Sequence, residues 1–530
     1  GVSSAASDVY KRQIIKDVHN LSAIAGWTAQ KESVNTSLLA GNGYPNDLVH
    51  TMNAASAITN WSATAYEWSL LSALARVQYS YKGKYLLSAA ARMDGSSRFG
   101  KNNRWGMFPS ASAGWYISEE DFMKDIKWLT SLKLRASYGI SGNFNIGNYE
   151  YYATLSEDNY VFGKADGTLA SGLRPATAGN PDLGWEKTAM FNLGLEIGLF
   201  NMLTLELDLY NSNTTDMLLN VPVAEFSGFS TVPMNIGKVN NKGVEFAIST
   251  TNTWGDFTWN NRFNISANRN EVKDLGGVDE MITTSESVTF ITKVGEPIGN
   301  YYTLVTDGVF ANQAEIDNSK NPDKSQRKYA YVSGAKPGDF RFKDMDGNME
   351  IDENDRTITG NYMPKFTYGF STDFKYKWFD LSVALQGVQG NKIANIFRRY
   401  IDNMEGGNNS QADALDRWQS ESNPGSGYVV RANRSATGMN GTTSTWHIED
   451  GSYMRIKNIT FGYTLPKSLL TNVGISRARV YFSTQNPFTF TKYSGYNPEV
   501  NMKGGSLTPG IDYGTYPLSK SFVFGLNVTF

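Results

Sequence analysis

The chain has 530 residues and a formal net charge of -2, so no bulk basic charge is present to recruit nucleic acid or an acidic surface. It contains no cysteine, which excludes a disulfide framework, a thiolate metal site and a cysteine nucleophile. Aromatic residues make up 13 % of the sequence and glycine occurs 50 times, a composition typical of β-proteins with many turns.

Alternating apolar and polar residues recur along the chain, from near Leu21 to Phe530. In residues 71–81 every second position is leucine, alanine, valine or tyrosine, and Lys82 and Gly83 lead directly into a second such stretch. Because successive side chains of a strand point to opposite faces, each stretch predicts a β-strand with one apolar face. We expect about 14 strands, at residues 20–29, 71–81, 83–93, 104–117, 132–140, 191–200, 202–210, 243–250, 257–267, 365–378, 379–387, 452–465, 477–485 and 521–530.

The links between these strands alternate between short and long. The short links are 82–83, 200–201, 254–256, 377–379, 118–130 and 466–476, and the long ones are 31–66, 94–104, 141–187, 211–242, 270–364, 389–451 and 487–520. Short turns at one end and long loops at the other are typical of outer-membrane barrels. A soluble β-sandwich also alternates but does not require this rhythm. Residues 118–129, behind a Ser118 cap, predict a short helix at the short-turn end.

The two faces of the predicted strands differ in chemistry. Aromatic residues beside the short turns have the same parity as the apolar residues of their strands, which means that they occupy the same alternate positions and the same face. An interfacial girdle has this arrangement, and its members are Tyr79, Tyr81, Tyr85, Trp254, Tyr376, Trp378 and Phe530. Charged residues occupy the opposite parity, which a wet lumen tolerates and lipid does not: Lys133, Arg135, Glu196, Glu206, Asp208 and Arg262. The pattern therefore predicts an all-β fold, a transmembrane antiparallel β-barrel in the outer membrane that contacts lipid on one face.

Several long segments carry a family resemblance. These are ARMDGSSRFGKNNRWGMFPSASAGWYISEEDFM, LKLRASYGISGN, GNPDLGWEKT, NIGKVNNKGVEF, PKFTYGF and SYMRIKNITFGYTLP. Together, in order from about residue 20 to Phe530, they resemble the SusC/RagA-type TonB-linked outer-membrane transporters of Bacteroidetes. The resemblance implies an importer rather than an enzyme, with a barrel of roughly 22 strands closed by an internal plug. It also implies a SusD-like surface lipoprotein as partner, TonB as energy source, and an oligosaccharide as the commonest cargo.

The sequence departs from that family at its start. No segment before residue 20 resembles a plug or a TonB box, so we interpret residues 14–530 as the C-terminal part of a barrel domain, a partial barrel. Residues 1–13 match neither the strand pattern nor the family, and we interpret them as a leader or artefact outside the fold. The resemblance gives Phe530 a role as the signal that barrel-insertion machinery recognises.

A second candidate site lies in KDMDGNMEIDEND, residues 343–355. Oxygen-bearing residues there follow the spacing of a Ca²⁺ loop, with ligands at positions one, three, five, seven, nine and twelve: Asp344, Asp346, Asn348, the Glu350 carbonyl, Asp352 and Asp355. Met349 stands where such loops normally carry glycine, and Asp355 stands where they carry a bidentate glutamate. A solvated acidic turn is the alternative. A bound cation would brace a long external loop; no other cofactor is expected.

Candidate ligand contacts are flat rings in the long loops, because such rings stack on sugars or pack on partners. They are Tyr149, Tyr151, Tyr152, Tyr160 and Trp446, and ordinary loop packing explains them as well. No catalytic constellation is evident, since the three histidines are scattered without metal-site spacing. Two functions remain open at this point. One is import of a nutrient, and the other is a non-transporting surface barrel that acts as a receptor or adhesin.

Overall fold

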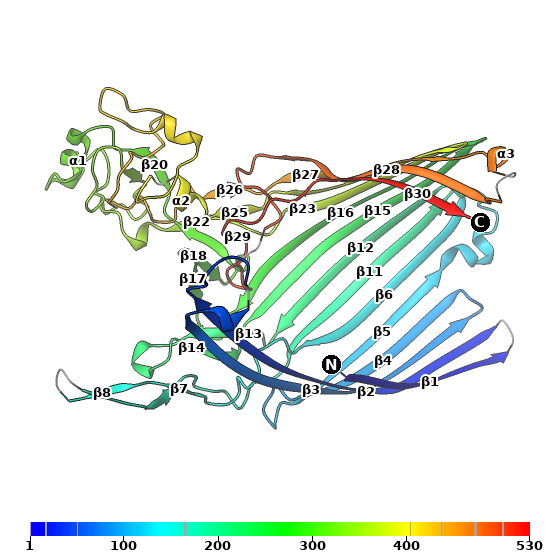
Figure 1. Ribbon diagram of the computed structural model, residues 1–530. Helices are drawn as coiled ribbons and strands as arrows, with labels where there is room; N and C mark the ends of the chain where they lie inside the picture. The colour runs from blue at the N-terminus through cyan, green and yellow to red at the C-terminus, as the bar shows by residue number, and fades with distance from the viewer. Residues whose placement is uncertain are drawn as a thin grey trace. The chain divides into compact units, whose positions relative to one another are not determined.

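The computed structural model describes residues 2–15, 18–49, 51–163, 167–402, 404–435, 437–470, 474–500 and 503–530. Its main feature is one sheet of 15 antiparallel strands whose spatial order follows the sequence (Figure 1). In that order the strands are β1 (Val2–Ile15), β2 (His19–Asn42), β3 (Ala57–Tyr81), β4 (Tyr85–Ser96), β5 (Trp105–Tyr116), β6 (Leu129–Asn143), β11 (Glu186–Leu199), β12 (Leu203–Thr215), β15 (Lys238–Trp254), β16 (Phe257–Asp274), β23 (Phe366–Tyr376), β24 (Phe379–Gln389), β27 (Tyr453–Thr464), β28 (Arg477–Thr491) and β30 (Ser521–Thr529).

The connections hold shorter elements. The strands among them are β7 (Leu155–Glu157), β8 (Tyr160–Phe162), β9 (Thr168–Ala170), β10 (Leu173–Pro175), β13 (Leu218–Pro222), β14 (Thr231–Asn235), β17 (Glu280–Ser285), β18 (Val288–Lys293), β19 (Asn300–Thr303), β20 (Thr306–Val309), β21 (Phe340–Phe342), β22 (Thr357–Asn361), β25 (Lys392–Asn395), β26 (Ile448–Asp450) and β29 (Ile511–Asp512). The helices are α1 (Gln313–Ser319), α2 (Arg398–Ile401) and α3 (Lys467–Leu470), with 3₁₀ turns η1 (Met52–Ala54), η2 (Ile117–Glu119), η3 (Asp121–Met123), η4 (Glu225–Ser227), η5 (Lys324–Gln326), η6 (Glu353–Asp355) and η7 (Ala412–Asp416). Within the described ranges, no helix has both the length and the hydrophobicity that a membrane span requires.

Every stretch predicted as a strand lies in this sheet, which confirms the all-β antiparallel prediction. The sheet also holds β1, which pairs with β2 from Val2↔Lys31 to Ile15↔His19, so there is one strand more than expected. Main-chain hydrogen bonds alone can hold an edge strand, and such a strand needs no apolar alternation in its sequence. The assignment of residues 1–13 to a leader outside the family stays a prediction.

The predicted long loop at residues 31–66 is wrong in extent. Strands β2 and β3 pair as far as Asn42↔Ala57, and only residues 43–56 connect them. The first eleven residues of β3 are all exposed, so this part of the ribbon has no buried face to impose an apolar pattern. A tilted membrane crossing needs about 9–11 residues. The remainder of β2 and β3 is held by backbone pairing, which leaves no hydrophobic signal in the sequence.

The helix predicted at residues 118–129 is also wrong. The chain forms the two 3₁₀ turns η2 and η3 there, and neither turn has a side-chain cap. Between them Glu120 is extended, because its carboxylate is held by Tyr85 at 2.6 Å, Trp115 at 3.0 Å and Lys84 at 3.2 Å. These hydrogen bonds tie the segment to the ends of β4 and β5 and interrupt the helix.

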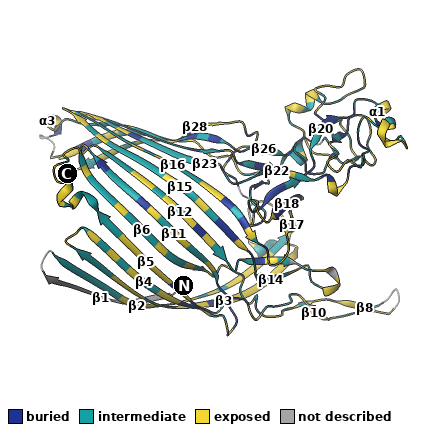
Figure 2. Ribbon diagram, turned by 180° about the vertical axis from the view of Figure 1, so that it is seen from behind, coloured by how far each residue is buried: buried dark blue, intermediate teal, exposed yellow. Residues whose placement is uncertain are grey.

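The chain divides into two compact units. The first comprises residues 1–126, 131–195 and 210–240, and the second comprises residues 127–130, 196–209 and 241–530. Along β4 and β6, exposed and half-buried residues follow one another in bands (Figure 2), and residues 109–113 of β5 are all exposed. On one face of these strands, Leu87, Met107 and Tyr138 are about half exposed or more, so this face of the sheet requires an apolar environment. Phe108 points to the other face and packs with Phe99 and Trp185.

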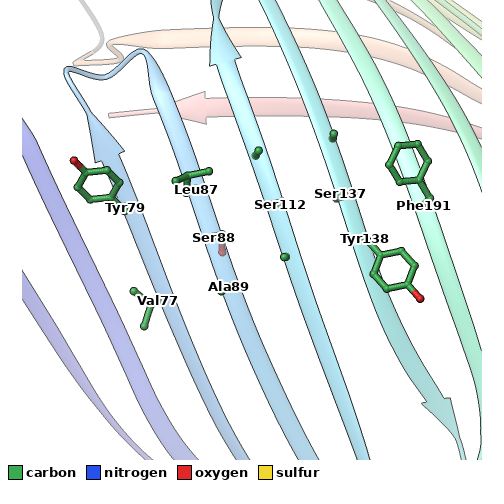
Figure 3. A pocket seen from close by; sticks show the side chains of 12 residues that line it. Val77, Tyr79, Leu87, Ser88, Ala89, Ser112, Ser137, Tyr138 and Phe191 are labelled. Atoms are coloured by element: carbon green, nitrogen blue, oxygen red, sulfur yellow. The ribbon is translucent and has the colours of Figure 1, made fainter.

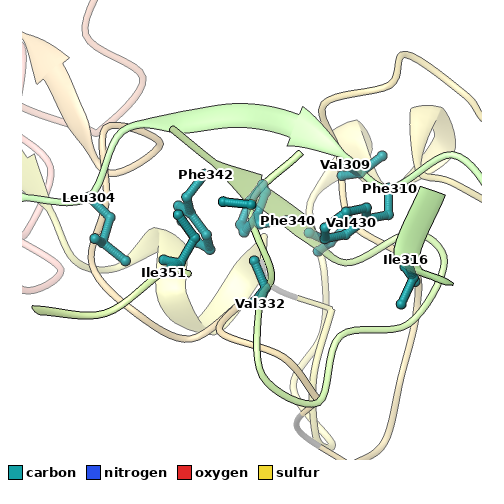
Figure 4. Packing of buried hydrophobic residues seen from close by; sticks show 10 residues of the cluster. Leu304, Val309, Phe310, Ile316, Val332, Phe340, Phe342, Ile351 and Val430 are labelled. Carbon is teal, nitrogen blue, oxygen red and sulfur yellow. The ribbon is translucent and has the colours of Figure 1, made fainter. Parts of the chain in front are cut away.

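The second unit contains a folded region that we call the loop subdomain, formed by the described residues within 275–365, 390–452 and 492–520. Its main core joins β20 and β21 to Val430 from the following connection, and Phe310, Phe340 and Ile351 pack within it (Figure 4). A second cluster brings together Phe290, Tyr301, Ile396 and Ile511. These connections, predicted simply as long loops, therefore have hydrophobic cores of their own.

Candidate functional site

The sheet of the first unit has a hollow on each face. On one face a groove of about 420 Å³ is lined mainly by apolar side chains, among them Val77, Leu87 and Phe191 (Figure 3). On the other face a pocket of about 530 Å³ has the charged side chains Lys133 and Arg135 in its lining, together with several serine and asparagine side chains. The same strands thus present hydrocarbon on one side and charge on the other, as the alternation predicts.

The register shows the same division in the second unit. Phe263 pairs with Phe370, and Phe370 pairs with Leu385, which forms an apolar row across β16, β23 and β24. The adjacent row carries Arg262 opposite Ser371. Arg262 therefore lies on the polar face, as the alternation in the sequence predicts. The remaining charges predicted for the lumen lie on β11 and β12: Glu196 and Asp208 are half-buried and Glu206 is exposed.

Aromatic rings line the short-turn ends of the strands in each unit. In the first, Tyr85 stacks on Trp115 with centroids 6.4 Å apart and lies 6.1 Å from Tyr81. In the second, Trp254 stacks on Phe257 at 5.9 Å. Tyr376 pairs with Phe257 on one side and Phe379 on the other. Both rows agree with the predicted interfacial girdle.

Trp378 departs from that prediction. It follows the turn at Lys377, which has a φ of 49°, and it lines a pocket surrounded by basic side chains at this strand end. The two-residue turn interrupts the alternation, so the parity of β23 no longer determines where the next side chain points.

In the candidate cation loop, three of the six predicted ligands converge. Carboxylate oxygens of Asp344, Asp346 and Asp355 lie within 4.8 Å of one another, and Asp355 is fully buried. Burial alone would raise the pKa of Asp344, but backbone N–H groups of Met349 and Gly347, together with the neighbouring carboxyl groups, hold it below its usual value. Such a cluster of carboxylate oxygens is the ligand type that a hard cation prefers.

The other three predicted ligands make hydrogen bonds within the loop or to a nearby lysine. Asn348 Oδ1 accepts from the Glu350 N–H at 2.6 Å, and Asp352 Oδ1 accepts from the Asn354 N–H at 2.7 Å. The Glu350 carboxylate pairs with Lys324 at 3.0 Å. The ligand predicted from Glu350 is its backbone carbonyl oxygen, not this carboxylate. Ligation by all six residues thus stays a prediction.

One feature that seemed to weaken the loop fits its geometry. Met349, at the position where glycine is usual, adopts the left-handed conformation with a φ of 61°. This is the backbone geometry that the sharp turn requires. Ile351, at the apolar eighth position, is buried in the loop-subdomain core. The loop is therefore anchored through Ile351 to a packed region that a bound cation would brace.

The predicted aromatic contacts do not form one cluster. Tyr149 braces β3, since its hydroxyl accepts from the Glu67 N–H at 3.0 Å. Tyr151 packs on Tyr152, whose ring centroid is 4.1 Å away, and Tyr160 packs against Phe162 at 4.9 Å. Tyr152 and Tyr160 remain more than half exposed.

Trp446 belongs to the loop subdomain of the second unit. Its ring lies 5.7 Å from Phe340 and 4.2 Å from the Arg398 guanidinium, so it packs within this subdomain. Of the predicted aromatic residues, only Tyr152 and Tyr160 offer a largely exposed ring to a ligand. Phe530 follows β30 and is 88 % exposed.

Sequence reasoning missed a buried polar cluster around Arg455. This guanidinium is 1 % exposed, and it hydrogen-bonds Asn497 at 2.8 Å and Thr489 at 2.9 Å while pairing with Glu499. Tyr453 donates to the same glutamate at 2.6 Å. The cluster ties residues 497–499 to β27 and β28. The available signal was an arginine flanked by Met454 and Ile456 in the motif SYMRIKNITFGYTLP.

Comparison with known proteins identifies the class. The chain matches the family described as TonB dependent receptor-like, beta-barrel, over residues 7–486. It is 36 % identical over 528 residues to TonB-dependent receptor P3 of Formosa agariphila, covering 97 % of this chain and 51 % of that one. It is 33 % identical over 484 residues to TonB-dependent receptor SusC of Bacteroides thetaiotaomicron, covering 88 % of this chain and 44 % of that one. A solved structure of the RagAB peptide transporter is 27 % identical with a TM-score of 0.81, over 100 % of this chain and 55 % of that one.

The chain belongs to the TonB-dependent receptor-like β-barrel family. Its fold is the barrel fold of that family, and its location is the outer membrane. The family consists of transporters and receptors rather than enzymes. The chain spans about half the length of the relatives it matches.

Proposed function

We propose that this chain is the C-terminal barrel portion of a SusC/RagA-type importer that takes up a nutrient across the outer membrane. One observation carries the proposal: strands with one apolar and one polar face occur in a chain at least 33 % identical, over 97 % of its length, to three TonB-dependent receptors. A polar inner face gives a hydrophilic cargo a path that hydrocarbon does not.

The proposed partners follow from the same family resemblance. A SusD-like surface lipoprotein would bind at the long-loop end, and TonB would act from the short-turn end. The loop subdomain supports the first part, because its packed cores give the long connections a defined surface.

For the cargo we propose an oligosaccharide, with a peptide as the rival. The exposed rings of Tyr152 and Tyr160 suit stacking on sugar faces. Similarity to the RagAB peptide transporter favours the rival. The aromatic rings also suit an extended peptide, so only a transport assay separates the two cargoes.

The test is deletion of the gene that encodes this chain, followed by uptake of fluorescent oligosaccharides and fluorescent peptides by whole cells. The proposal expects loss of oligosaccharide uptake and its restoration by the intact gene. Loss of peptide uptake alone would transfer the assignment to peptides. Unchanged uptake of both, with retained surface binding, would support a non-transporting receptor or adhesin instead.

We further propose that residues 344–355 bind Ca²⁺ as a structural ion. The convergence of Asp344, Asp346 and Asp355 supports this assignment, as does the left-handed Met349. Bound cation would offset the repulsion among three carboxylates and stabilise the loop subdomain through Ile351.

A further inference from the structure

A strongly basic pocket lies at the short-turn end of the second unit. Its volume is about 590 Å³, and five cationic side chains line it with a single acidic one: Lys375, Lys377, Lys467, Arg477, Arg479 and Asp380. The chain as a whole has 49 lysines and arginines against 51 aspartates and glutamates. The excess of positive charge in this pocket is therefore a local feature and does not follow from composition.

The one acidic group in the pocket is already neutralised. Asp380 forms a two-point contact with Arg479, in which Nε donates to Oδ1 at 2.9 Å and Nη2 donates to Oδ2. Lys375, Lys377 and Arg477 are all exposed. Among the residues that the structure describes, none of these three forms an ion pair with a carboxylate. Like charges gathered in a hollow raise its positive potential and attract an anion.

The pocket lies on the polar face of the strands. Lys375 is paired with Asp380 across β23 and β24, and Arg479 is paired with Thr464 across β27 and β28. Directly paired residues share a face of the sheet. Of the strand residues that line the pocket, only Phe379 has the apolar parity.

The position of the pocket on the polar face favours an acidic peptide over a membrane lipid as the bound anion. A membrane lipid approaches a barrel from its apolar face, where Phe482 and Phe524 form a cross-strand pair. Arg477 and Arg479 occupy the other parity of β28, away from hydrocarbon. An acidic peptide can reach that face from the water at the strand ends. An arginine guanidinium binds a carboxylate through two parallel hydrogen bonds, which would hold such a peptide in a defined orientation.

We propose that this basic pocket binds the carboxylates of an acidic peptide segment that approaches from the short-turn end of the sheet. Arg477 would form the principal two-point contact, while Lys375 and Lys377 would supply further charge. The proposal rests on the proposed function for one point only: in an importer, the short-turn end is the periplasmic side.

The test measures binding of fluorescein-labelled hexaglutamate to the whole chain in detergent by fluorescence anisotropy. The double variant Lys375→Gln/Arg477→Gln should weaken binding by about tenfold or more, because two charge-assisted contacts are lost. The matched control Lys365→Gln/Lys520→Gln removes the same charge outside the pocket and should bind like the wild type. Equal weakening in both variants, or no binding by the wild type, would overturn the proposal.

Competition then identifies the source of the anion. Unlabelled hexaglutamate should displace the probe, whereas inorganic phosphate and phosphatidylglycerol nanodiscs should do so weakly. Displacement by either at equal charge concentration would overturn the peptide assignment and indicate a phosphate or lipid-headgroup site. If the double variant does not fold, Lys377→Asn provides a second test, since asparagine tolerates the left-handed turn. It should weaken binding measurably, and wild-type affinity would count against the proposal.

Failure of this inference is distinguishable from failure of the proposed import. Hexaglutamate binding is measured on purified protein and needs no cargo, so it can succeed even if cells show no uptake defect. Normal uptake with no peptide binding would remove the inference and leave the import proposal intact.

Discussion

Arg479 reaches Asp380 across an intervening strand, with its Nε 2.9 Å from the carboxylate Oδ1. The two residues belong to β28 and β24, and β27 lies between them. Gly462 of β27 makes the contact possible. A Cβ added there would lie 2.3 Å from Arg479 Nη2, a separation that no relaxed structure tolerates.

Substitution of Gly462 by valine should therefore break this ion pair. We expect the free energy of unfolding to fall by about 1–3 kcal/mol, because a charge-assisted hydrogen bond is lost at a partly buried position. The measurement is urea unfolding in detergent micelles. Gly114→Ala is the control, since its Cβ would meet Leu86 at an ordinary 3.5 Å. An unchanged midpoint for the valine variant would show that the pair contributes nothing to stability.

Calcium should stabilise the loop subdomain of the wild-type chain. At 100 times its dissociation constant a ligand adds about 2.7 kcal/mol to the free energy of unfolding. Terbium luminescence and hydrogen exchange over residues 340–356 report binding and protection. Asp346→Asn and Asp355→Asn should abolish both responses. Glu353→Gln should retain both, because this exposed glutamate pairs with Arg356, just after η6, and is not one of the converging carboxylates. Terbium signal that survives in all variants would contradict the site.

His447 should make the loop subdomain sensitive to acid. It is 1 % exposed, and burial, together with the charges of Arg398 and Arg399, lowers its pKa to about 3 from an ordinary 6.5. The unfolded chain therefore binds more protons between those two values. Stability due to the neutral histidine is fully present above pH 6.5 and is lost as the pH falls towards 3, by about 1.4 kcal/mol per pH unit.

Hydrogen exchange over residues 440–450 measures this loss directly. Stability should depend less steeply on pH in His447→Gln than in the wild type. The difference in free energy of opening between the two proteins at each pH gives the contribution of the histidine. The variant's lower stability at neutral pH is not itself the test. Identical slopes between pH 4 and 6 would mean that His447 does not titrate as its burial requires.

Phe530 should be required for efficient assembly in the outer membrane. Phe530→Ser should reduce the heat-modifiable, folded fraction in isolated membranes several-fold if insertion machinery reads this residue, as the family resemblance implies. Phe226→Ser is the control, because Phe226 is 95 % exposed in a long connection and loses the same ring. Equal folded fractions for the two variants would remove the insertion role.

How far the sequence predicted this structure depends on whether a strand has one buried or lipid-facing side. Strands β4, β5 and β30 alternate along most of their length, and their positions followed from that pattern. The outer half of β3 is exposed on both faces, so nothing in its composition distinguished it from a loop. Glu120 shows a different limit: a single carboxylate with three partners, Lys84, Tyr85 and Trp115, overrode a clear amphipathic helix pattern.

The candidate sites show the same contrast. The cation loop was predictable because its ligands are close in sequence, whereas Arg455 and Glu499 are 44 residues apart and only the folded chain brings them together. The basic pocket needs residues from β23, β24 and β28. None of these segments is unusual by itself, and their charges add up only after the strands are in register.

The most direct test of the account is the environment of neighbouring residues along one strand. The chain has no cysteine, so single cysteines at Leu87 and Ser88 can carry spin labels without background. In lipid vesicles the label at Leu87 should collide with oxygen and be shielded from a water-soluble nickel reagent, and the label at Ser88 should show the reverse. Equal nickel access at both positions, or a folded monomer in buffer without detergent, would contradict a sheet with lipid on one face and water on the other.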